Sequence, residues 1–499
     1  MSILTIIETT SVRVRNLVAT GDKTKYFYWG LGALVALNTL RFTVASFTMH
    51  TAFNTFGFDL GIIHHATWLL SRFEDPFSTV NGLHFFAGHA RFISVLVVPM
   101  AWLWEGAGLL LFLQALMLSL GAIPVFLIAK EKLGSNLIGT AIVLCYLLFP
   151  ALGHLNLENF HYNSFLTTFF LYAFYFLIRG NYTRYFIFIF LALITKEEAI
   201  ATVLMLGVYA VFQNKKVGFG TLAVTLIYML VLLKIVFPAF NPEGYSFYSR
   251  LQVVDVFFSD PFSLSTYPEI WSIVKKNLFT QVNGAYLWQM LYPVGLLPLL
   301  SPATLLLSGS LYINLLSDWS YTHSIKYHYV SAVIPFIFIS VIYGLALLRT
   351  SAAKRWLPYI VMGLVVTSVV GNEAHGPGRT KLSSLKEFSR DLERATFVDT
   401  RFRNIAQLIP DDATVSATYN LVPHLSARRI IFQYPNPFVR DYWGLSSKAP
   451  YTDIKFVDYV IHDTRRDKEY ELFAKLVEAE TYVIEKSEGP FVLYKYTGS

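Results

Sequence analysis

Long apolar runs, separated by short polar or charged segments, make up most of the chain before residue 372. About eleven of them are long enough, or nearly so, to cross roughly 30 Å of hydrocarbon as helices. Several are short, so we expect their helices to extend into the flanking residues. The pattern predicts an α-helical polytopic membrane protein whose transmembrane domain covers residues 26–372. The predicted spans lie near residues 26–48, 107–129, 137–152, 164–178, 184–195, 199–213, 217–237, 286–300, 303–316, 329–348 and 356–371.

Two of the segments between these runs are long. The first, over residues 49–106, includes the apolar stretch 92–104, which at about thirteen residues is too short to span a bilayer. Trp102 and Trp104 lie near its end, which favours an interfacial or re-entrant helix with both indoles at headgroup depth. The second segment, over residues 238–285, is polar and aromatic, and we expect it to form a partly helical cap.

The pattern changes after residue 372, and residues 373–499 are predicted to form a small α/β domain. A charged amphipathic segment predicts a helix, and short alternating runs of β-branched and aromatic residues predict strands. Because strands and helices alternate, a compact α/β fold is expected rather than a flexible tail. The predicted helices cover residues 379–409 and 467–479; the predicted strands cover 414–418, 429–434 and 458–463; and a hairpin over 482–496 turns at Glu488–Gly489.

Composition agrees with a membrane protein. Hydrophobic residues make up 54% of the chain and charged residues 15%, compared with about 25% charged in soluble domains. The mean hydropathy is +0.47, which excludes a soluble protein with a large core. The chain has one cysteine, Cys145, in an apolar run, so an intrachain disulfide is excluded.

Basic residues set the expected orientation. The N-terminal segment 1–25 carries Arg13, Arg15, Lys23 and Lys25, and the run that follows is too long for a signal-peptide core, so it is predicted to be a retained first span. Basic residues in alternate loops then place the N-terminus in the cytoplasm. An odd number of spans puts the C-terminal domain outside the cell membrane, with all twelve histidines and most carboxylates on the outer side. Since the basic residues line cytoplasmic loops, a nucleic-acid partner is not expected. The other predicted inner residues are Lys130, Lys132, Arg179, Arg184, Lys215, Lys216, Arg349, Lys354 and Arg355.

Five motifs follow one another along the chain: FDLGIIHHATWLL with the following GHARF, ENFHYNSF, LALITKEEA, NLLSDWSYTHSIKYHYVSAVIPF and DDATVSATYNLVPHLSARRIIFQYP. Taken together, from about residue 50 to 465, they resemble the DUF2079 family of predicted multispanning membrane proteins. Gly88 precedes His89, where the resemblance leads us to expect an acid. That family is similar to membrane glycosyltransferases with the GT-C fold. The similarity implies a GT-C-like fold, a polyprenyl-phosphate sugar donor and an acidic residue in the first outer loop.

Asp59 is the predicted catalytic residue. It follows the first span within a short connection, and a carboxylate there can accept the proton of an attacking hydroxyl or amine. The alternative is a helix N-cap, because an Asp before an apolar run is a common helix start. His64 and His65 follow about one and a half helical turns later. Either is a candidate for donor binding, although adjacent helical side chains do not both face one site.

Four further positions are candidates for donor binding or for a metal ion. His89 and Arg91 are suited to a lipid phosphate, although Arg91 equally suits a side chain that extends to the headgroups. Glu158 and His161 are three residues apart and share a helical face. Together with His89 they offer metal ligands, so a divalent metal ion is one interpretation, but no tight ligand spacing is present and the cofactor stays open.

The remaining candidates lie beside later spans. Lys196 and Glu197 follow the fifth span and suit a lipid phosphate, or else a solvated cluster that caps the next helix. Lys326 and His328 lie among tyrosines before the tenth span. They suit an anionic headgroup, and the alternative is an aromatic interface belt. The sequence contains no phosphate-binding GxxxxGK[ST] loop, no GxGxxG and no HExxH motif.

The functional prediction is a membrane glycosyltransferase-like protein that works on a polyprenyl-phosphate donor in the lipid bilayer, at the outer face. One alternative is a transporter or flippase of lipid-linked intermediates, for which paired mid-span charges are expected; only Arg41 and Lys234 approach that. The other is a non-catalytic subunit that presents its C-terminal domain to a membrane protein partner. Sugar, acceptor and oligomeric state are not specified by these patterns.

Overall fold

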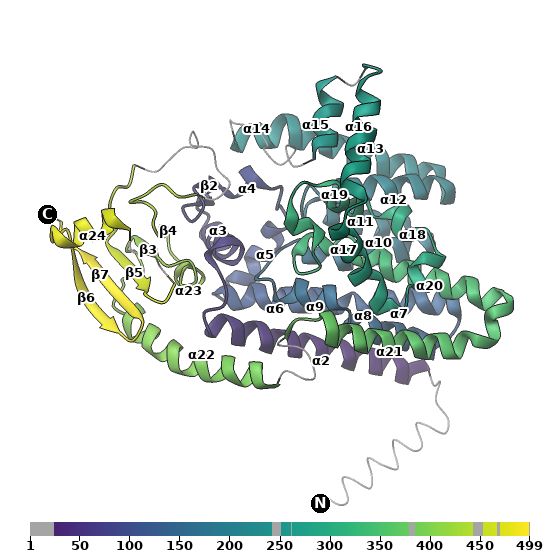
Figure 1. Cartoon of the computed structure of the whole chain (residues 1–499), viewed down its shortest axis with the longest axis horizontal. Coiled ribbons are helices and arrows are strands. Elements are labelled where there is room, and N and C mark those ends of the chain that lie inside the picture. The colour runs from purple at the N-terminus through teal and green to yellow at the C-terminus, as the bar shows by residue number, and fades with distance from the viewer. Residues whose placement is uncertain are drawn as a thin grey trace, which may run out of the picture.

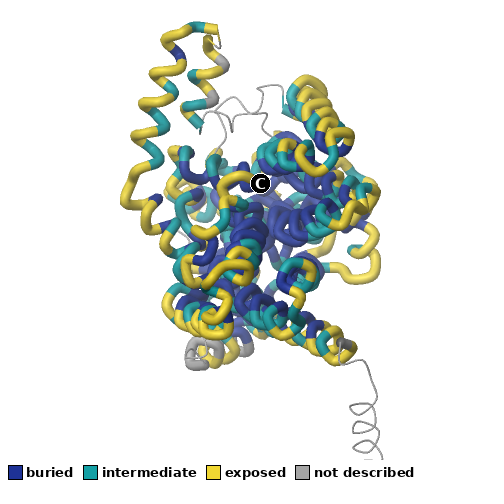
Figure 2. The backbone as a smooth tube through the Cα atoms, turned by 90° about the vertical axis from the view of Figure 1, so that its right-hand side faces the viewer, coloured by how far each residue is buried: buried dark blue, intermediate teal, exposed yellow. Residues whose placement is uncertain are grey.

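The computed structural model describes residues 24–241, 251–260, 262–378, 385–442, 453–466 and 470–498. A large helical body lies on one side of the molecule and a small sheet lies on the other (Figure 1). The long helix α22 (Leu385–Ala406) runs between the two. Figure 2 shows that buried residues concentrate in the middle of the helical body and exposed ones at its periphery.

Four helical stretches within the described residues are long and apolar enough to cross a membrane: Lys25–Thr51, Ala107–Leu133, Lys215–Phe240 and Ala352–His375. A fifth is possible if a pair of helices bent by 47° forms one span. The stretch 107–133 is central, with 67% of its apolar window buried, whereas 215–240 is peripheral, with 17% buried. These stretches confirm helices at five predicted spans. They comprise α2 (Thr24–Thr51), α6 (Ala107–Leu120), α7 (Ala122–Leu133), the bent pair α8 (Asn136–Leu147) and α9 (Pro150–Leu157), α13 (Lys215–Val231), α14 (Phe237–Phe240) and α21 (Leu357–His375).

The other predicted spans divide into two groups. Four are shorter apolar helices: α10 (Ser164–Ile178), α11 (Tyr182–Leu193), α12 (Ala199–Gln213) and α20 (Ile334–Thr350). Near 286–300 and 303–316 neither predicted span is one continuous helix, because the chain there forms α17 (Gln281–Leu291), single turns, α18 (Ala303–Leu307) and α19 (Gly309–Leu316). Gly295 and Leu296 have φ values of 61° and 57°, and this left-handed backbone ends a helix. The count of eleven spans therefore stays a prediction.

Residues 49–106, called the first outer segment after the side on which they are predicted to lie, fold as a series of short elements. A five-residue turn, Gly57–Gly61, leads into α3 (Ile62–Ser71), followed by a small hairpin of β1 (Phe77–Ser78) and β2 (Leu83–His84). Then come α4 (Phe85–Gly88) and α5 (Ser94–Ala101). Helix α5 confirms a short helix within residues 92–104. The cap predicted over 238–285 contains α15 (Gln252–Ser259) and α16 (Thr266–Leu278), while 242–250 and 261 lie outside the described residues.

The C-terminal region is a mixed five-stranded sheet in the order β4-β3-β5-β7-β6. Strand β3 (Val415–Ala417) is parallel to both β4 (Ile431–Gln433) and β5 (Tyr459–Asp463). Strands β6 (Tyr482–Glu488) and β7 (Phe491–Tyr496) form the predicted antiparallel hairpin. Two short helices, α23 (Val422–Leu425) and α24 (Glu471–Glu478), accompany them. The α/β prediction is confirmed for the described part; of the two predicted helices, 379–384 and 467–469 lie outside it.

The two faces of this sheet pack against different partners. Val415, Ile461 and Leu493 belong to the same apolar cluster as the helical body. On the other face, Val460 packs with Phe473 of α24. Alternate residues of a strand point to opposite faces, so one face joins the sheet to the helical body through a continuous core. The loops after β3 and β4 are thereby held beside the first outer segment.

Candidate functional site

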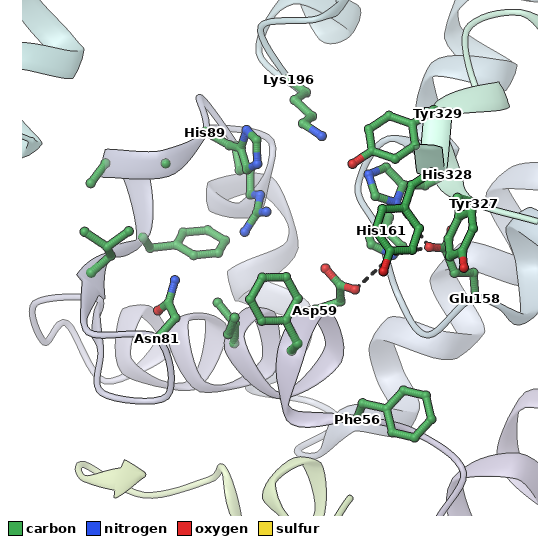
Figure 3. A pocket seen from close by; sticks show the side chains of 18 of the residues that line it. Phe56, Asp59, Asn81, His89, Glu158, His161, Lys196, Tyr327, His328 and Tyr329 are labelled. Carbon is green, nitrogen blue, oxygen red and sulfur yellow. Dashed lines mark hydrogen bonds and ion pairs between the residues drawn. The ribbon is translucent and has the colours of Figure 1, made fainter. Parts of the chain in front are cut away.

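A cavity of about 730 Å³ lies where the first outer segment, the α9–α10 turn, the segment before α20 and the C-terminal sheet meet (Figure 3). Its wall combines aromatic rings with ionisable side chains, as expected of a site for an amphipathic ligand. The ionisable residues are Asp59, His84, His89, Arg91, Glu158, His161, Lys196 and His328. The rings are those of Phe56, Phe58, Phe85, Trp319, Tyr321, Tyr327, Tyr329 and Tyr419.

Asp59 sits in the middle of the Gly57–Gly61 turn with φ of 67° and ψ of −87°. A non-glycine residue in such a conformation costs roughly 1–3 kcal/mol and is held there by its surroundings. Gly61 occupies the N-cap position of α3, and no side chain caps that helix. The N-cap interpretation of Asp59 is therefore wrong. Its carboxylate faces the cavity instead, with Oδ2 at 3.6 Å from Nε2 of His161 (Figure 3).

The Gly57–Gly61 turn packs against the C-terminal region on the side away from the cavity. The Gly57 N–H donates to the carbonyl of Tyr419 at 2.6 Å. A Cβ atom on Gly61 would lie 2.9 Å from Cγ1 of Val422, so glycine is required for this close approach. The turn that carries Asp59 is thus shaped by contacts with the sheet domain more than 350 residues later in the chain.

A second turn, between α9 and α10, presents Glu158 and His161. Gln114 of α6 is fully buried and supports it: Nε2 donates to the carbonyls of Asn156 and Asn159, and Oε1 accepts from the His161 N–H, all at 2.9 Å. Asn159 has φ of 46°, and its Oδ1 accepts from the Phe56 N–H at 2.9 Å. One buried amide therefore fixes this turn, and Asn159 joins it to the turn of Asp59.

Glu158, His161 and His328 form one compact cluster. Oε1 of Glu158 lies 3.4 Å from Nδ1 of His328 and 3.7 Å from Nε2 of His161. The two imidazole rings are stacked, with centroids 3.8 Å apart. One ligand atom from each residue lies within 4.8 Å of the others, which is compatible with a metal ion. Of the predicted metal set, Glu158 and His161 come together, but His89 is replaced by His328.

Cationic side chains lie on another part of the wall. Lys196 is only 4% exposed, and its Nζ lies 3.6 Å from Oε2 of Glu198. Arg91 lies over the ring of Phe85, 5.4 Å from its centroid. His89 is held by Glu197, whose Oε1 lies 2.6 Å from His89 Nδ1. Lys196 and His89 are seen above Asp59 in Figure 3, so cations and a carboxylate share one cavity.

Burial perturbs the protonation of this site. It raises the pKa of Asp59 to about 6, although Arg91 and Lys196 act to lower it. Burial also raises the pKa of Glu158 well above its ordinary value, and the neighbouring Asp59 adds to the rise. Burial lowers the pKa of His161 well below its ordinary range, and the positive charge of Lys196 lowers it further. His161 is therefore neutral at pH 7, while Asp59 is mostly ionised. Strong shifts of this kind are frequent at functional sites.

The structure brings together most of the residues singled out from the sequence. Seven line the cavity: Asp59, His89, Arg91, Glu158, His161, Lys196 and His328. Glu197 lies behind His89 and also accepts from the Ala90 N–H at 2.9 Å, so it supports the loop rather than the cavity wall.

Two predicted binding residues lie elsewhere. His64 is buried against the C-terminal region, where its Nδ1 lies 2.7 Å from Oγ of Ser426. Helix α3 turns that side chain away from the cavity. Lys326 is exposed, and it does not line the cavity although its neighbours Tyr327 and His328 do. Neither residue is placed to bind a ligand in this cavity.

Sequence analysis missed three residues of the site. Gln114 lies within an apolar run, where a single polar amide side chain among apolar neighbours was the available signal. Tyr419 and Gln433 line the cavity from the sheet domain. Both fall within the motif DDATVSATYNLVPHLSARRIIFQYP, but no local pattern indicates that this motif reaches the first outer segment.

Two solved structures of ArnT from Cupriavidus metallidurans are similar to this chain. The one bound to undecaprenyl phosphate has a TM-score of 0.52 at 13% identity, covering 93% of this chain and 97% of ArnT. The apo structure has a TM-score of 0.52 at 14% identity, covering 94% and 98%. At these identities the likeness shows the fold alone, which is of the GT-C type. No curated protein matches the chain.

The family comparison covers most of the sequence. Residues 49–488 match the model of the family DUF2079, described as "Predicted membrane protein". The matched region contains both turns of the cavity, the cationic residues and four of the five strands of the C-terminal sheet, and β7 lies beyond it. This chain therefore belongs to the DUF2079 family of predicted membrane proteins.

Proposed function

We propose that this protein transfers a sugar from a polyprenyl-phosphate carrier to an acceptor at the outer face of the membrane. The observation that carries the proposal is that Asp59, on a strained turn, shares one cavity with Arg91 and Lys196 beside apolar helices. The GT-C-type fold supports it, and so does undecaprenyl phosphate bound in a solved structure of similar fold. The basic residues of the predicted inner loops support a cytoplasmic N-terminus and an outward-facing cavity.

Each reacting group has a residue of suitable chemistry. A hydroxyl or amine of the acceptor attacks the anomeric carbon, and its proton passes to the Asp59 carboxylate. The bond between that carbon and the phosphate oxygen breaks, and the bonding pair leaves with the polyprenyl phosphate. Arg91 and Lys196 stabilise the charge on the departing phosphate. A single displacement of this kind inverts the configuration at the anomeric carbon.

Binding of the carrier is tested first. Purified protein in nanodiscs is titrated with undecaprenyl phosphate, and binding is followed by native mass spectrometry. Replacing a cation that pairs with phosphate removes about 1.5–3 kcal/mol, so Lys196→Met and Arg91→Met should each weaken binding roughly 10- to 100-fold. Lys130→Met is the matched control, because Lys130 lies at the end of α7 and bonds Tyr28. Equal affinity in all four proteins would refute the proposed carrier site.

Transfer is tested with a set of undecaprenyl-phosphate sugars and membrane extracts as acceptor. Asp59→Asn keeps the shape and removes the base, so transfer should fall by about 10²–10⁴-fold. Asp412→Asn, at an exposed position before β3, is the control and should retain full transfer. Wild-type rates in Asp59→Asn would contradict the mechanism. Carrier binding without transfer by the wild-type protein, for every sugar tested, would favour the non-catalytic alternative.

A further inference from the structure

We propose that Glu158, His161 and His328 bind one divalent transition-metal ion of the zinc class in the wall of the cavity, next to Asp59. The proposal deepens the proposed function, since it concerns the same cavity. It nevertheless stands on the ligand geometry alone and does not require a sugar donor. The three residues come from two segments, the α9–α10 turn and the single turn at His328–Val330, which the fold brings together.

The spacing of the ligand atoms matches a tetrahedral ion. Nitrogen and oxygen ligands lie about 2.0–2.1 Å from zinc, so two of them at tetrahedral angles are separated by roughly 3.3–3.4 Å. Oε1 of Glu158 is 3.4 Å from Nδ1 of His328 and 3.7 Å from Nε2 of His161. All three atoms lie within 4.8 Å of one another. The imidazole rings of His161 and His328 are stacked with centroids 3.8 Å apart, so both side chains must rotate apart to direct their nitrogens at one ion.

The alternative, a network of hydrogen bonds, does not satisfy the same atoms. Nε2 of His161 is 3.6 Å from Asp59 and 3.7 Å from Glu158, beyond the usual 2.7–3.2 Å of an N–H···O bond. Among the described residues, Nε2 of His161 and Oε2 of Glu158 are buried without a hydrogen-bond partner. Buried polar atoms are nearly always paired, and a metal ion is a partner that uses the His161 lone pair.

Hydrogen bonds from Gln114 to the backbone hold the turn that carries two of the three ligands. Gln114 accepts from the His161 N–H and donates to two carbonyls of the same turn. Residues behind the ligands fix their orientation and contribute to affinity. The side chain of His161 is 3% exposed, that of His328 12% and that of Glu158 14%, so the ligands are shielded yet border the cavity.

The ligand set indicates the class of metal. Two imidazoles and one carboxylate suit zinc and neighbouring transition metals, whereas magnesium and calcium prefer oxygen ligands. Three protein ligands leave a fourth position for a water molecule or a ligand oxygen from the cavity. A metal ion held by these residues would lower the pKa of a bound water molecule, and Asp59, whose Oδ2 is 3.6 Å from Nε2 of His161, would lie beside it.

The test measures metal binding without any sugar donor. Full-length protein, purified without a histidine tag and treated with chelator, is titrated with Zn²⁺ and with Co²⁺. We expect one equivalent per chain and a visible cobalt spectrum of tetrahedral form. Glu158→Gln and His328→Gln should each weaken binding at least about 100-fold, while His375→Gln, at the end of α21 and outside the cavity wall, should bind like the wild type. Size-exclusion profiles and thermal unfolding establish that each variant is folded.

Two outcomes would overturn the proposal. One is less than a tenth of an equivalent of zinc in folded wild-type protein. The other is equal binding in the wild type and both ligand variants, which would indicate an adventitious ion only. Neither outcome bears on undecaprenyl phosphate binding to Arg91 and Lys196. Failure of the carrier or transfer experiments, in turn, leaves the metal titration intact.

Discussion

The contact between the Asp59 turn and the C-terminal sheet makes a prediction that needs no substrate. Gly61 lies directly against Val422, which is fully buried. Replacing Gly61 by alanine places a methyl group 2.9 Å from Cγ1 of Val422. Real Cβ atoms do not approach other carbons so closely, so the turn or α23 must move.

The size of the effect follows from two opposing contributions. Gly61 has φ of −64° and ψ of −45°, which alanine adopts freely, and the loss of glycine freedom in the unfolded chain stabilises by about 0.4–1 kcal/mol. Overpacking of a buried contact costs typically 1–3 kcal/mol. The expected net result is a destabilisation of roughly 0–2.6 kcal/mol, the difference between these terms.

A double-mutant cycle isolates the contact. Thermal unfolding of Gly61→Ala, Val422→Ala and the double variant is followed by tryptophan fluorescence in the same detergent. Because Val422→Ala removes the clashing methyl group, the double variant should be more stable than the two costs added together, with a coupling of about 0.5–2 kcal/mol. Gly32→Ala on α2, where an added Cβ meets nothing within 4 Å, is the control. Strictly additive costs would refute this account of the interface.

Three further predictions concern protonation, orientation and the support of the second turn. Since burial raises the pKa of Asp59 to about 6, transfer should decline as pH falls through 6, and Lys196→Met should move this decline to higher pH; a pH profile unchanged by the variant would contradict the assignment. Because the pKa of Asp59 is raised from 3.8 to about 6, the folded state binds more protons than the unfolded state in this window, and the free energy of unfolding falls as pH rises through it. At pH 7, Asp59→Asn should therefore unfold at the same temperature as the wild type or at a higher one. Lys475→Cys in a Cys145→Ser background should react with an impermeant maleimide in intact cells; reaction only after lysis would reverse the proposed orientation. Gln114→Leu leaves the backbone N–H of His161 and two carbonyls without their partner, so it should destabilise the folded protein by at least about 1–3 kcal/mol. An unchanged melting temperature would show that Gln114 does not stabilise this turn.

The sequence by itself determined the elements with strong local patterns. The strands near Val415, Ile431 and Tyr459, and the hairpin turning at Glu488–Gly489, follow from alternating residues and turn chemistry. The long apolar helices follow from run length, because backbone groups in hydrocarbon must bond within their own segment. Such patterns are read over a few turns or a few strand residues, so distant contacts are not needed to form them.

Composition could not show where an apolar run breaks. Residues 286–316 are as apolar as the spans around them, yet the chain departs from the helix at Gly295 and Leu296, which are left-handed. Pro293, Pro298 and Pro302 lie in the same stretch, so helix-breaking residues were present locally, but the length of an apolar run does not take them into account. Packing against α21 and α20 accompanies the break: Ser368 donates to the carbonyl of Pro293 at 2.8 Å, and Gly344 lies against the carbonyl of Leu297.

The sequence indicated which residues belong to the site, but not which of their side chains contact one another. Acidic, basic and histidine residues in the segments between the apolar runs identified seven members of the cavity wall. Only the tertiary structure replaced His89 by His328 beside Glu158, turned His64 towards Ser426, and brought Tyr419 to the turn of Asp59. A side chain's partner depends on which face of its element is buried and on contacts made hundreds of residues away. Sequence spacing shows which side chains are neighbours within one helix or strand. This cavity is formed by segments that are distant in the sequence and that only the packed core brings together.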